Sequence, residues 1–200
     1  MDRVLILNGS PRAPKSNSKR YAEIFSGKFS GQTEYFNISK KNHREICSKL
    51  DGVSDVMFVF PLYVDGIPVT LLQFLKTLER NPPRSKPVVS VLINCGFLED
   101  WQTDVAIKMM ALFCRQNGYR LGSVLKIGGG EAILDTPFRM LAVRKIKQMA
   151  VSIAKAKYRT LHTTMPLSPN MFTKASTSYW IRYGKKNGIT KEQMQTMRIE

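Results

Sequence analysis

The segment between residues 8 and 18 concentrates hydroxyl, amide and basic side chains that could together bind an anion. The candidates for that role are Ser10, Arg12, Ser16, Asn17 and Ser18. An apolar run at residues 4–7 precedes the segment and indicates a strand buried on both faces, and a helical pattern at residues 19–25 follows it. Backbone amides at a helix N-terminus attract negative charge, and serine hydroxyls add donors. The segment therefore predicts a phosphate site.

A serine-rich turn is also common for purely structural reasons, because serine caps helices and stabilises turns. The spacing matches neither the glycine fingerprint of dinucleotide-binding proteins nor the P-loop of nucleoside triphosphatases. The turn alone therefore leaves both interpretations open.

Two later segments favour a ligand site, since each follows a continuous apolar run, at residues 56–60 and 88–93. The first contains Pro61, Leu62, Tyr63 and Val64, and the second contains Asn94, Cys95, Gly96 and Phe97. A rigid proline, two aromatic rings and a glycine that allows close backbone approach suit a flat conjugated ring. Ordinary strand-to-helix turns are the alternative. The turn at residues 128–130 could likewise admit a ligand or be merely flexible, and Glu131 beside it is a candidate for a polar contact.

Five strand-like segments alternate with five helical patterns, which predicts a parallel sheet with helices on both faces. The strands are expected at residues 4–7, 33–38, 56–60, 88–93 and 121–127. The second and fifth alternate polar and apolar residues, as edge strands do, and the order 2-1-3-4-5 places them at the edges. The classical Rossmann order needs a sixth strand and buries the second. We therefore expect a flavodoxin-like α/β fold with a five-stranded parallel sheet, whose ligands bind where the first, third and fourth strands end.

Length and composition suit one domain at residues 1–159, followed by an extension at residues 160–200 that packs on the domain or on a second subunit. Within the extension, Thr190 and Gln193 have the spacing of a capping box. The apolar surface around Trp180 favours a homodimer.

The formal net charge is +16, which attracts nucleic acid, anionic membranes or anionic small molecules. The cations are spread along the chain, and their densest stretch, residues 139–159, has the pattern of a solvated helix face, so we do not expect a nucleic-acid partner. No apolar run approaches the ~18 residues that span a bilayer, and no signal-peptide pattern is present, so we expect a cytoplasmic protein without membrane insertion. The three cysteines lack metal-ligand spacing, and no metal site is expected.

The loop motifs together resemble those of flavodoxin-like NAD(P)H-dependent FMN reductases and oxidoreductases. GSPRAPKSNS is similar to the family's phosphate loop, PLYVDGIP to its flavin loop, and NCGFLED and GGGE to its later segments, so that the resemblance covers residues 3–158. It implies that Ser10, Ser16, Asn17 and Ser18 hold the FMN phosphate, with Arg12 nearby. It also implies that residues 61–64 line the isoalloxazine and that residues 94–97 close its other side.

The resemblance implies an oxidoreductase that passes hydride from NAD(P)H through bound FMN to a quinone, a flavin or another small acceptor. The flavin carries the chemistry, so no catalytic side chain is named. An electron-transfer protein of the flavodoxin type is one alternative, although its carriers are typically acidic. A flavin-free binding protein on the same scaffold is the other.

Overall fold

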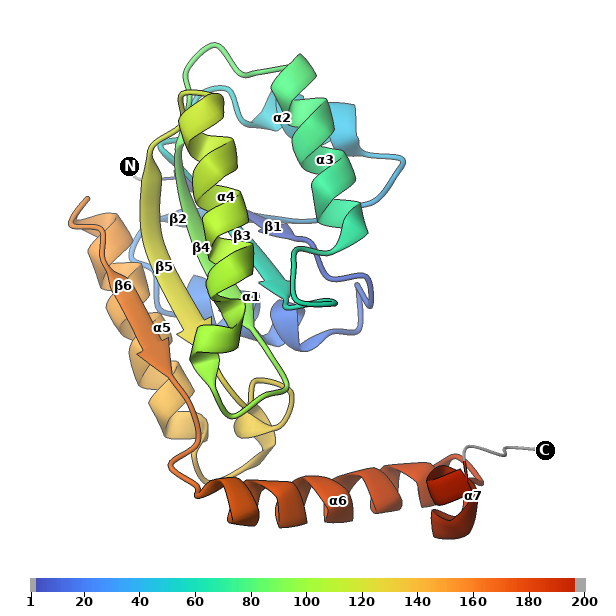
Figure 1. Cartoon of the computed structure of the whole chain (residues 1–200). Helices are drawn as coiled ribbons and strands as arrows, with labels where there is room; N and C mark the ends of the chain where they lie inside the picture. Colours follow the sequence, from blue (N-terminus) through green and yellow to red (C-terminus); the bar gives the residue numbers. More distant parts are fainter. Residues whose placement is uncertain (1–2, 197–200) are drawn as a thin grey trace. The chain divides into compact units, whose positions relative to one another are not determined.

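The computed structural model describes residues 3–196, in which six parallel strands form one sheet (Figure 1). The strands are β1 (Arg3–Asn8), β2 (Gln32–Asn37), β3 (Asp55–Pro61), β4 (Val88–Asn94), β5 (Leu121–Ile127) and β6 (Thr160–Thr163). Their order is β2-β1-β3-β4-β5-β6. The predicted order of the first five strands is therefore confirmed, and the prediction of only five strands is wrong.

The missed strand β6 is short, and its side chains alternate between exposed and buried positions. Four residues with one large apolar side chain, Leu161, give too weak a pattern to be read from sequence. Its presence moves β5 from the edge to the interior of the sheet. The polar residues of β5 that suggested an edge have specific partners, because Ser123 bonds with Ser152 (2.6 Å) and Lys126 bonds with Asp104 (2.9 Å).

Helices cover both faces of the sheet (Figure 1). One face carries α1 (Asn17–Ser26) and α5 (Arg139–Ala154), and the other carries α2 (His43–Lys49), α3 (Val69–Arg80) and α4 (Asp104–Gln116). Two short 3₁₀ turns, η1 (Asp100–Thr103) and η2 (Ile133–Asp135), connect strand ends to α4 and α5. Three of the four interior strands, β1, β3 and β4, are almost wholly buried, as their continuous apolar runs require.

The chain divides into two compact units, the first ending at Met165 and the second beginning at Pro166. The first unit thus extends past the expected boundary at residue 159, because β6 belongs to the sheet. The second unit contains α6 (Pro169–Lys186) and α7 (Lys191–Thr196). Thr190 and Gln193 exchange the two hydrogen bonds of the predicted capping box, at 2.8 and 3.2 Å. None of the helices within residues 3–196 combines the length and the apolar character needed to cross a membrane.

Candidate functional site

The carboxyl ends of β1, β3 and β4 open onto a single cavity of about 430 Å³. Its lining residues are Ser10, Pro11, Arg12, Ser16, Asn17, Ser18, Pro61, Leu62, Tyr63, Asn94, Cys95, Gly96 and Glu131. Eleven of the thirteen residues predicted from sequence to hold the cofactor are among them, and so is Glu131, the candidate for a polar contact. Val64 and Phe97 are the exceptions, since both are exposed and neither lines the cavity.

Buried Asn8, the last residue of β1, fixes the start and the end of the serine-rich loop. Its side-chain oxygen accepts a hydrogen bond from the Ser10 amide (2.9 Å), and its amide nitrogen donates to the Ser16 hydroxyl (3.2 Å). The same nitrogen also contacts the hydroxyl of Tyr35 on β2 at 2.9 Å. Asn8 was not among the candidate site residues from sequence. A polar residue closing a four-residue apolar run was the signal that could have found it.

Ser16 is the N-cap of α1, where its hydroxyl accepts a hydrogen bond from the Lys19 amide. Within residues 3–196 the hydroxyls of Ser10 and Ser16 accept hydrogen bonds and donate none, so both protons are available to a ligand. Ser18 differs, because its hydroxyl is buried and contacts the Asn94 amide (3.4 Å). This end of the cavity therefore offers two hydroxyl donors beside a helix N-terminus, which suits a phosphate.

Arg12 and Glu131 face each other at the rim of the cavity, 3.6 Å apart. The Arg12 side chain is about 71% exposed, so the pair is loosely held and the guanidinium can turn toward an anion. The backbone carbonyl of Glu131 accepts a hydrogen bond from the Asn17 side chain at 2.9 Å. The Asn17 side chain therefore links α1 to the turn after β5.

The loop after β3 forms a tight turn in which Tyr63 and Gly66 exchange two backbone hydrogen bonds, both 3.1 Å long. Val64 and Asp65 at its centre have φ angles of +47° and +55°, so the turn has the geometry that usually selects asparagine and glycine. A β-branched residue in this conformation is strained, and Val64 gains no burial in return, since it is 88% exposed. Strain of this kind gathers at functional sites, and the turn presents Tyr63 to the cavity.

The loop after β4 packs directly against the glycine turn that follows β5. The amides of Gly129 and Gly130 donate to the carbonyls of Phe97 (2.5 Å) and Cys95 (2.7 Å). A Cβ atom at Gly128 would lie 2.4 Å from the Leu98 carbonyl oxygen, and one at Gly130 would lie 2.7 Å from the Asn94 Cβ. These glycines are therefore needed for contact between two loops, and none of them lines the cavity.

Helix α1 is hydrogen-bonded to the same glycine turn on its other side. The hydroxyl of buried Tyr21 donates to the Gly130 carbonyl at 2.6 Å, and burial raises the pKa of Tyr21. Arg20 pairs with Asp135 at 2.5 Å, and this hydrogen bond lowers the pKa of the Asp135 carboxyl. Helix α1 at the serine-rich end of the cavity and the loop after β4 at the other end are thus joined through residues 129–135.

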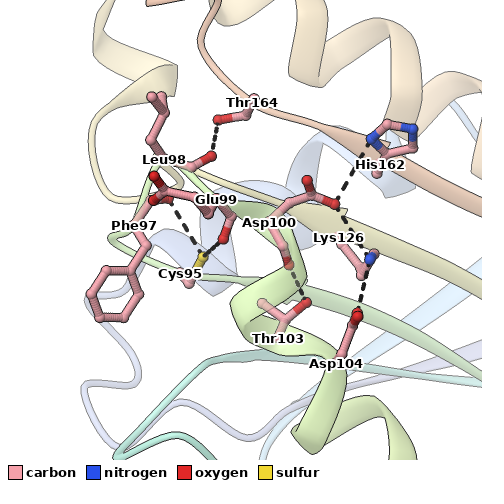
Figure 2. A network of polar contacts seen from close by, with 10 residues as sticks. All are labelled: Cys95, Phe97, Leu98, Glu99, Asp100, Thr103, Asp104, Lys126, His162 and Thr164. Carbon is pink, nitrogen blue, oxygen red and sulfur yellow. Dashed lines mark hydrogen bonds and ion pairs between the residues drawn. The ribbon is translucent and has the colours of Figure 1, made fainter. Parts of the chain in front are cut away.

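Cys95 lines the cavity but is almost fully buried. Burial raises the pKa of its thiol to about 11, and the sulfur lies 3.6 Å from the Phe97 carbonyl and 3.8 Å from that of Glu99 (Figure 2). A thiol in this state is neutral at physiological pH and a poor nucleophile. Cys95 therefore contributes to the shape of the cavity, and we do not expect it to form a covalent bond with a ligand.

A charged network anchors the segment that carries the β4 loop into α4 (Figure 2). Lys126 of β5 contacts the carboxylates of Asp104 (2.9 Å) and Asp100 (3.5 Å), and Asp100 also faces His162 of β6 (3.8 Å). Partial burial by itself would lower the pKa of Lys126, but the hydrogen bond with Asp104 and the charge of Asp100 outweigh it and raise the pKa. The network therefore links the segment between β4 and α4 to β5 and β6.

Comparison with known proteins identifies the fold. No family model and no curated protein matches this chain. Among solved structures, the FMN-dependent NADH-azoreductase of Bacillus anthracis in complex with FMN is similar over 77% of this chain and 100% of its own, with a TM-score of 0.57 and 17% identity. The NAD(P)H:quinone oxidoreductase of Methanothermobacter marburgensis matches 76% of this chain and 95% of its own (TM-score 0.61, 15% identity).

A third match is the rubredoxin oxygen:oxidoreductase of the anaerobe Desulfovibrio gigas, with a TM-score of 0.61 and 16% identity over 78% of this chain. The chain spans only 36% of the length of that protein. At these identities the likeness shows the fold. The chain has a flavodoxin-like α/β fold, as the loop motifs and strand order predicted.

Replacing Gly130 with alanine tests the contact between the two loops. We expect Gly130→Ala to lower the free energy of unfolding by about 1–3 kcal/mol, because the new Cβ overlaps Asn94. Thermal and urea unfolding measure the change. Gly27→Ala is the matched control, since its Cβ would meet only ordinary contacts at 3.6 Å or more and its φ of −71° suits alanine. Equal stability of the two variants would contradict the assigned role.

Replacing Lys126 with methionine tests the charged network. The variant leaves two carboxylates without their shared cation, so we expect a loss of about 1–3 kcal/mol at pH 7, measured by urea unfolding. Because the folded-state pKa of Lys126 is raised, the contribution of Lys126 to stability is complete below pH ~10.5. That contribution is lost as pH rises through the folded-state pKa. The deficit should also shrink below pH ~4, where the carboxylates become protonated. Lys108→Met, on the exposed surface of α4, should show no such pH dependence.

Proposed function

We propose that this protein is an FMN-dependent oxidoreductase that passes hydride from NAD(P)H through bound flavin to a quinone, a flavin or another small acceptor. The observation that carries the proposal is the cavity, which joins the hydroxyls of Ser10 and Ser16 and a helix N-terminus at one end to Tyr63 and Gly96 at the other. The similarity in fold to FMN-dependent and NAD(P)H-dependent oxidoreductases supports it.

The residues present fit FMN. The hydroxyls of Ser10 and Ser16 and the first amides of α1 would hold the phosphate, and Arg12 would neutralise part of its charge. Ser18 and Asn94 would act indirectly, by locking the two loops together.

The remaining cavity residues would hold the ring. Pro61, Leu62 and Tyr63 would lie along the isoalloxazine, with Cys95 and Gly96 on its other side. The exposed Val64 and Phe97 would stand at the rim, where they could contact only an entering substrate. Bound FMN would supply hydride acceptance from nicotinamide and electron delivery to the acceptor. The protein would orient the ring and exclude molecules that could react with it in place of the substrate. Neither role requires a side-chain acid or base.

Flavin binding and reduction test the proposal with purified protein. We expect FMN to bind with quenching of its fluorescence, and absorbance near ~450 nm to bleach when NADH or NADPH is added without oxygen. Addition of a quinone should restore the absorbance. Failure to bind FMN would overturn the proposal in favour of a flavin-free binding protein, and bound flavin that neither nicotinamide reduces would indicate an electron carrier.

The phosphate end can be tested separately with Ser16→Ala. Loss of a hydroxyl that bonds a charged group should weaken FMN binding about 10–100-fold while leaving riboflavin binding unchanged. Ser168→Ala is a matched control, because Ser168 caps α6 in the same way and accepts a hydrogen bond from the Met171 amide. Equal losses for FMN and riboflavin would show that Ser16 does not contact the phosphate.

A homodimer and a cytoplasmic location are part of the proposal. Trp101, Val105, Met109 and Leu112 form an exposed apolar stripe along η1 and α4. The stripe adjoins the turn that carries Tyr63, since a Cβ on Gly66 would contact the Met109 sulfur at 3.6 Å. The three buried free cysteines are typical of a reducing compartment.

Sedimentation velocity tests the dimer and the surface that forms it. We expect the wild type to sediment as a dimer and Val105→Glu as a monomer, with Lys76→Glu on the exposed surface of α3 as the control. The sequence pointed instead to the region of Trp180, whose ring contacts those of Tyr179 and Tyr183. A monomer produced by Trp180→Glu and not by Val105→Glu would move the interface there. A monomeric wild type would overturn the dimer.

A further inference from the structure

The positive charge of this protein is concentrated in one part of the sequence. Residues 1–135 carry eighteen Lys and Arg against thirteen Asp and Glu. No acidic residue lies between Asp135 and Glu192, and that segment contains twelve Lys and Arg. Charge asymmetry on this scale is typical of proteins that bind a polyanion.

Five of those cations line a groove of about 520 Å³ beside α5. We call it the basic groove, and its lining residues are Arg144, Lys147, Gln148, Val151, Ser152, Lys155, Lys157 and Arg159. Positions 144, 147, 148, 151 and 155 follow helical spacing, so they form one stripe along α5 and its C-cap. The stripe runs from residue 144 to residue 155, and at ~1.5 Å per residue its length is about 16 Å.

The second wall of the groove is built by a chain reversal after α5. Ala156 has a φ of +49°, and the amides of Ala156 and Lys157 donate to the carbonyls of Ile153 and Ser152, both at 2.9 Å. This is a Schellman motif with alanine in the position that favours glycine. The Arg159 amide then contacts the Ser123 hydroxyl at 3.4 Å, which fixes the backbone beside β5. Lys157 and Arg159 thus return alongside the stripe.

The five cations of the basic groove have no ion-pair partner within residues 3–196. Lys126 and Arg20 of the same unit, by contrast, are both paired with carboxylates. A cation at a helix C-terminus is stabilised by the helix dipole, which accounts for Lys155. It does not account for Arg144 and Lys147, which lie two or three turns earlier. Clustering unpaired like charges along a groove is unfavourable unless an anion binds there.

Although the sequence pattern of residues 139–159 indicated only a solvated helix face, we propose that the basic groove formed there binds the phosphate backbone of double-stranded nucleic acid without regard to sequence. A strand of a duplex carries one phosphate per ≈ 3.4 Å, so a stripe of about 16 Å runs beside about five phosphates. Arg144, Lys147 and Lys155 lie on this stripe, and Lys157 and Arg159 lie on the second wall of the groove. Val151 is the only large apolar side chain in the lining, which disfavours a membrane surface, where apolar side chains insert. The lining has no aromatic ring on which unpaired bases could stack.

The basic groove is separate from the cavity proposed for flavin. It lies at the amino end of β6, which begins at Thr160, whereas the cavity lies at the carboxyl ends of the parallel strands. The proposal therefore does not depend on flavin binding, and each site can be removed without the other.

Binding of the full-length chain to a fluorescently labelled 20-base-pair duplex of mixed sequence tests the proposal, by anisotropy between 50 and 200 mM salt. We expect Arg144→Gln, Lys147→Gln and Lys157→Gln combined to weaken binding about tenfold or more and to reduce the slope of log K against log salt by about 2.7. The control combines Lys40→Gln, Lys41→Gln and Lys76→Gln, which removes the same charge from exposed sites without ion pairs. Thermal unfolding and FMN binding should be unchanged in both.

Several results would overturn the proposal. One is no duplex binding at 50 mM salt, and another is an equal loss in the control, which would assign binding to net charge alone. Equally tight binding of single-stranded DNA would reject the duplex as the preferred ligand. Binding to vesicles containing phosphatidylserine, lost in the groove variant while duplex binding is retained, would assign the groove to a membrane surface.

Discussion

The close backbone contact between the loop after β4 and the glycine turn after β5 is the constraint on which the candidate site depends. Side chains at Gly128 or Gly130 would overlap the Leu98 carbonyl or Asn94. Because the contact exists, Tyr21 and Asn17 of α1 can reach the far side of the same turn. Two walls of the cavity, α1 and the loop after β4, are therefore held by hydrogen bonds to one short segment. Backbone groups supply most of this support, so the architecture can persist while side chains diverge, which is consistent with the likeness to solved structures at only 15–17% identity.

Two buried asparagines connect the apolar sheet to the polar site. Asn8 ends β1 and Asn94 ends β4, and each turns its amide toward the loops beyond the strand. A buried amide is costly unless it is hydrogen-bonded, and both have partners within the protein. Ser10, Ser16 and Ser18 are thus positioned before any ligand arrives. Pre-organisation of this kind reduces the entropy that binding must overcome.

The sequence predicted the features that depend on local pattern. Continuous apolar runs identified β1, β3 and β4, and turn composition identified most of the cavity lining. The failures came from tertiary partners that no local pattern carries. Lys126 and Ser123 made β5 resemble an edge strand, because their partners Asp104 and Ser152 lie elsewhere in the chain. The role of Gly128 and Gly130 was misread for the same reason, since a glycine needed against another loop has the same local appearance as a flexible one.

Within the first unit, the unpaired cations of the basic groove lie away from the cavity, which limits the influence of the positive charge on ligand binding there. The only cation in the cavity lining is Arg12, and Glu131 faces it. The unpaired cations of the basic groove lie at the opposite end of the sheet. Electrostatic interactions between the two ends of the sheet are screened at physiological ionic strength, where the Debye length is about 8 Å. The large net charge therefore does little to select a phosphorylated nicotinamide at the cavity. Its physical consequence lies at the basic groove, whose lining has five cations and no carboxylate.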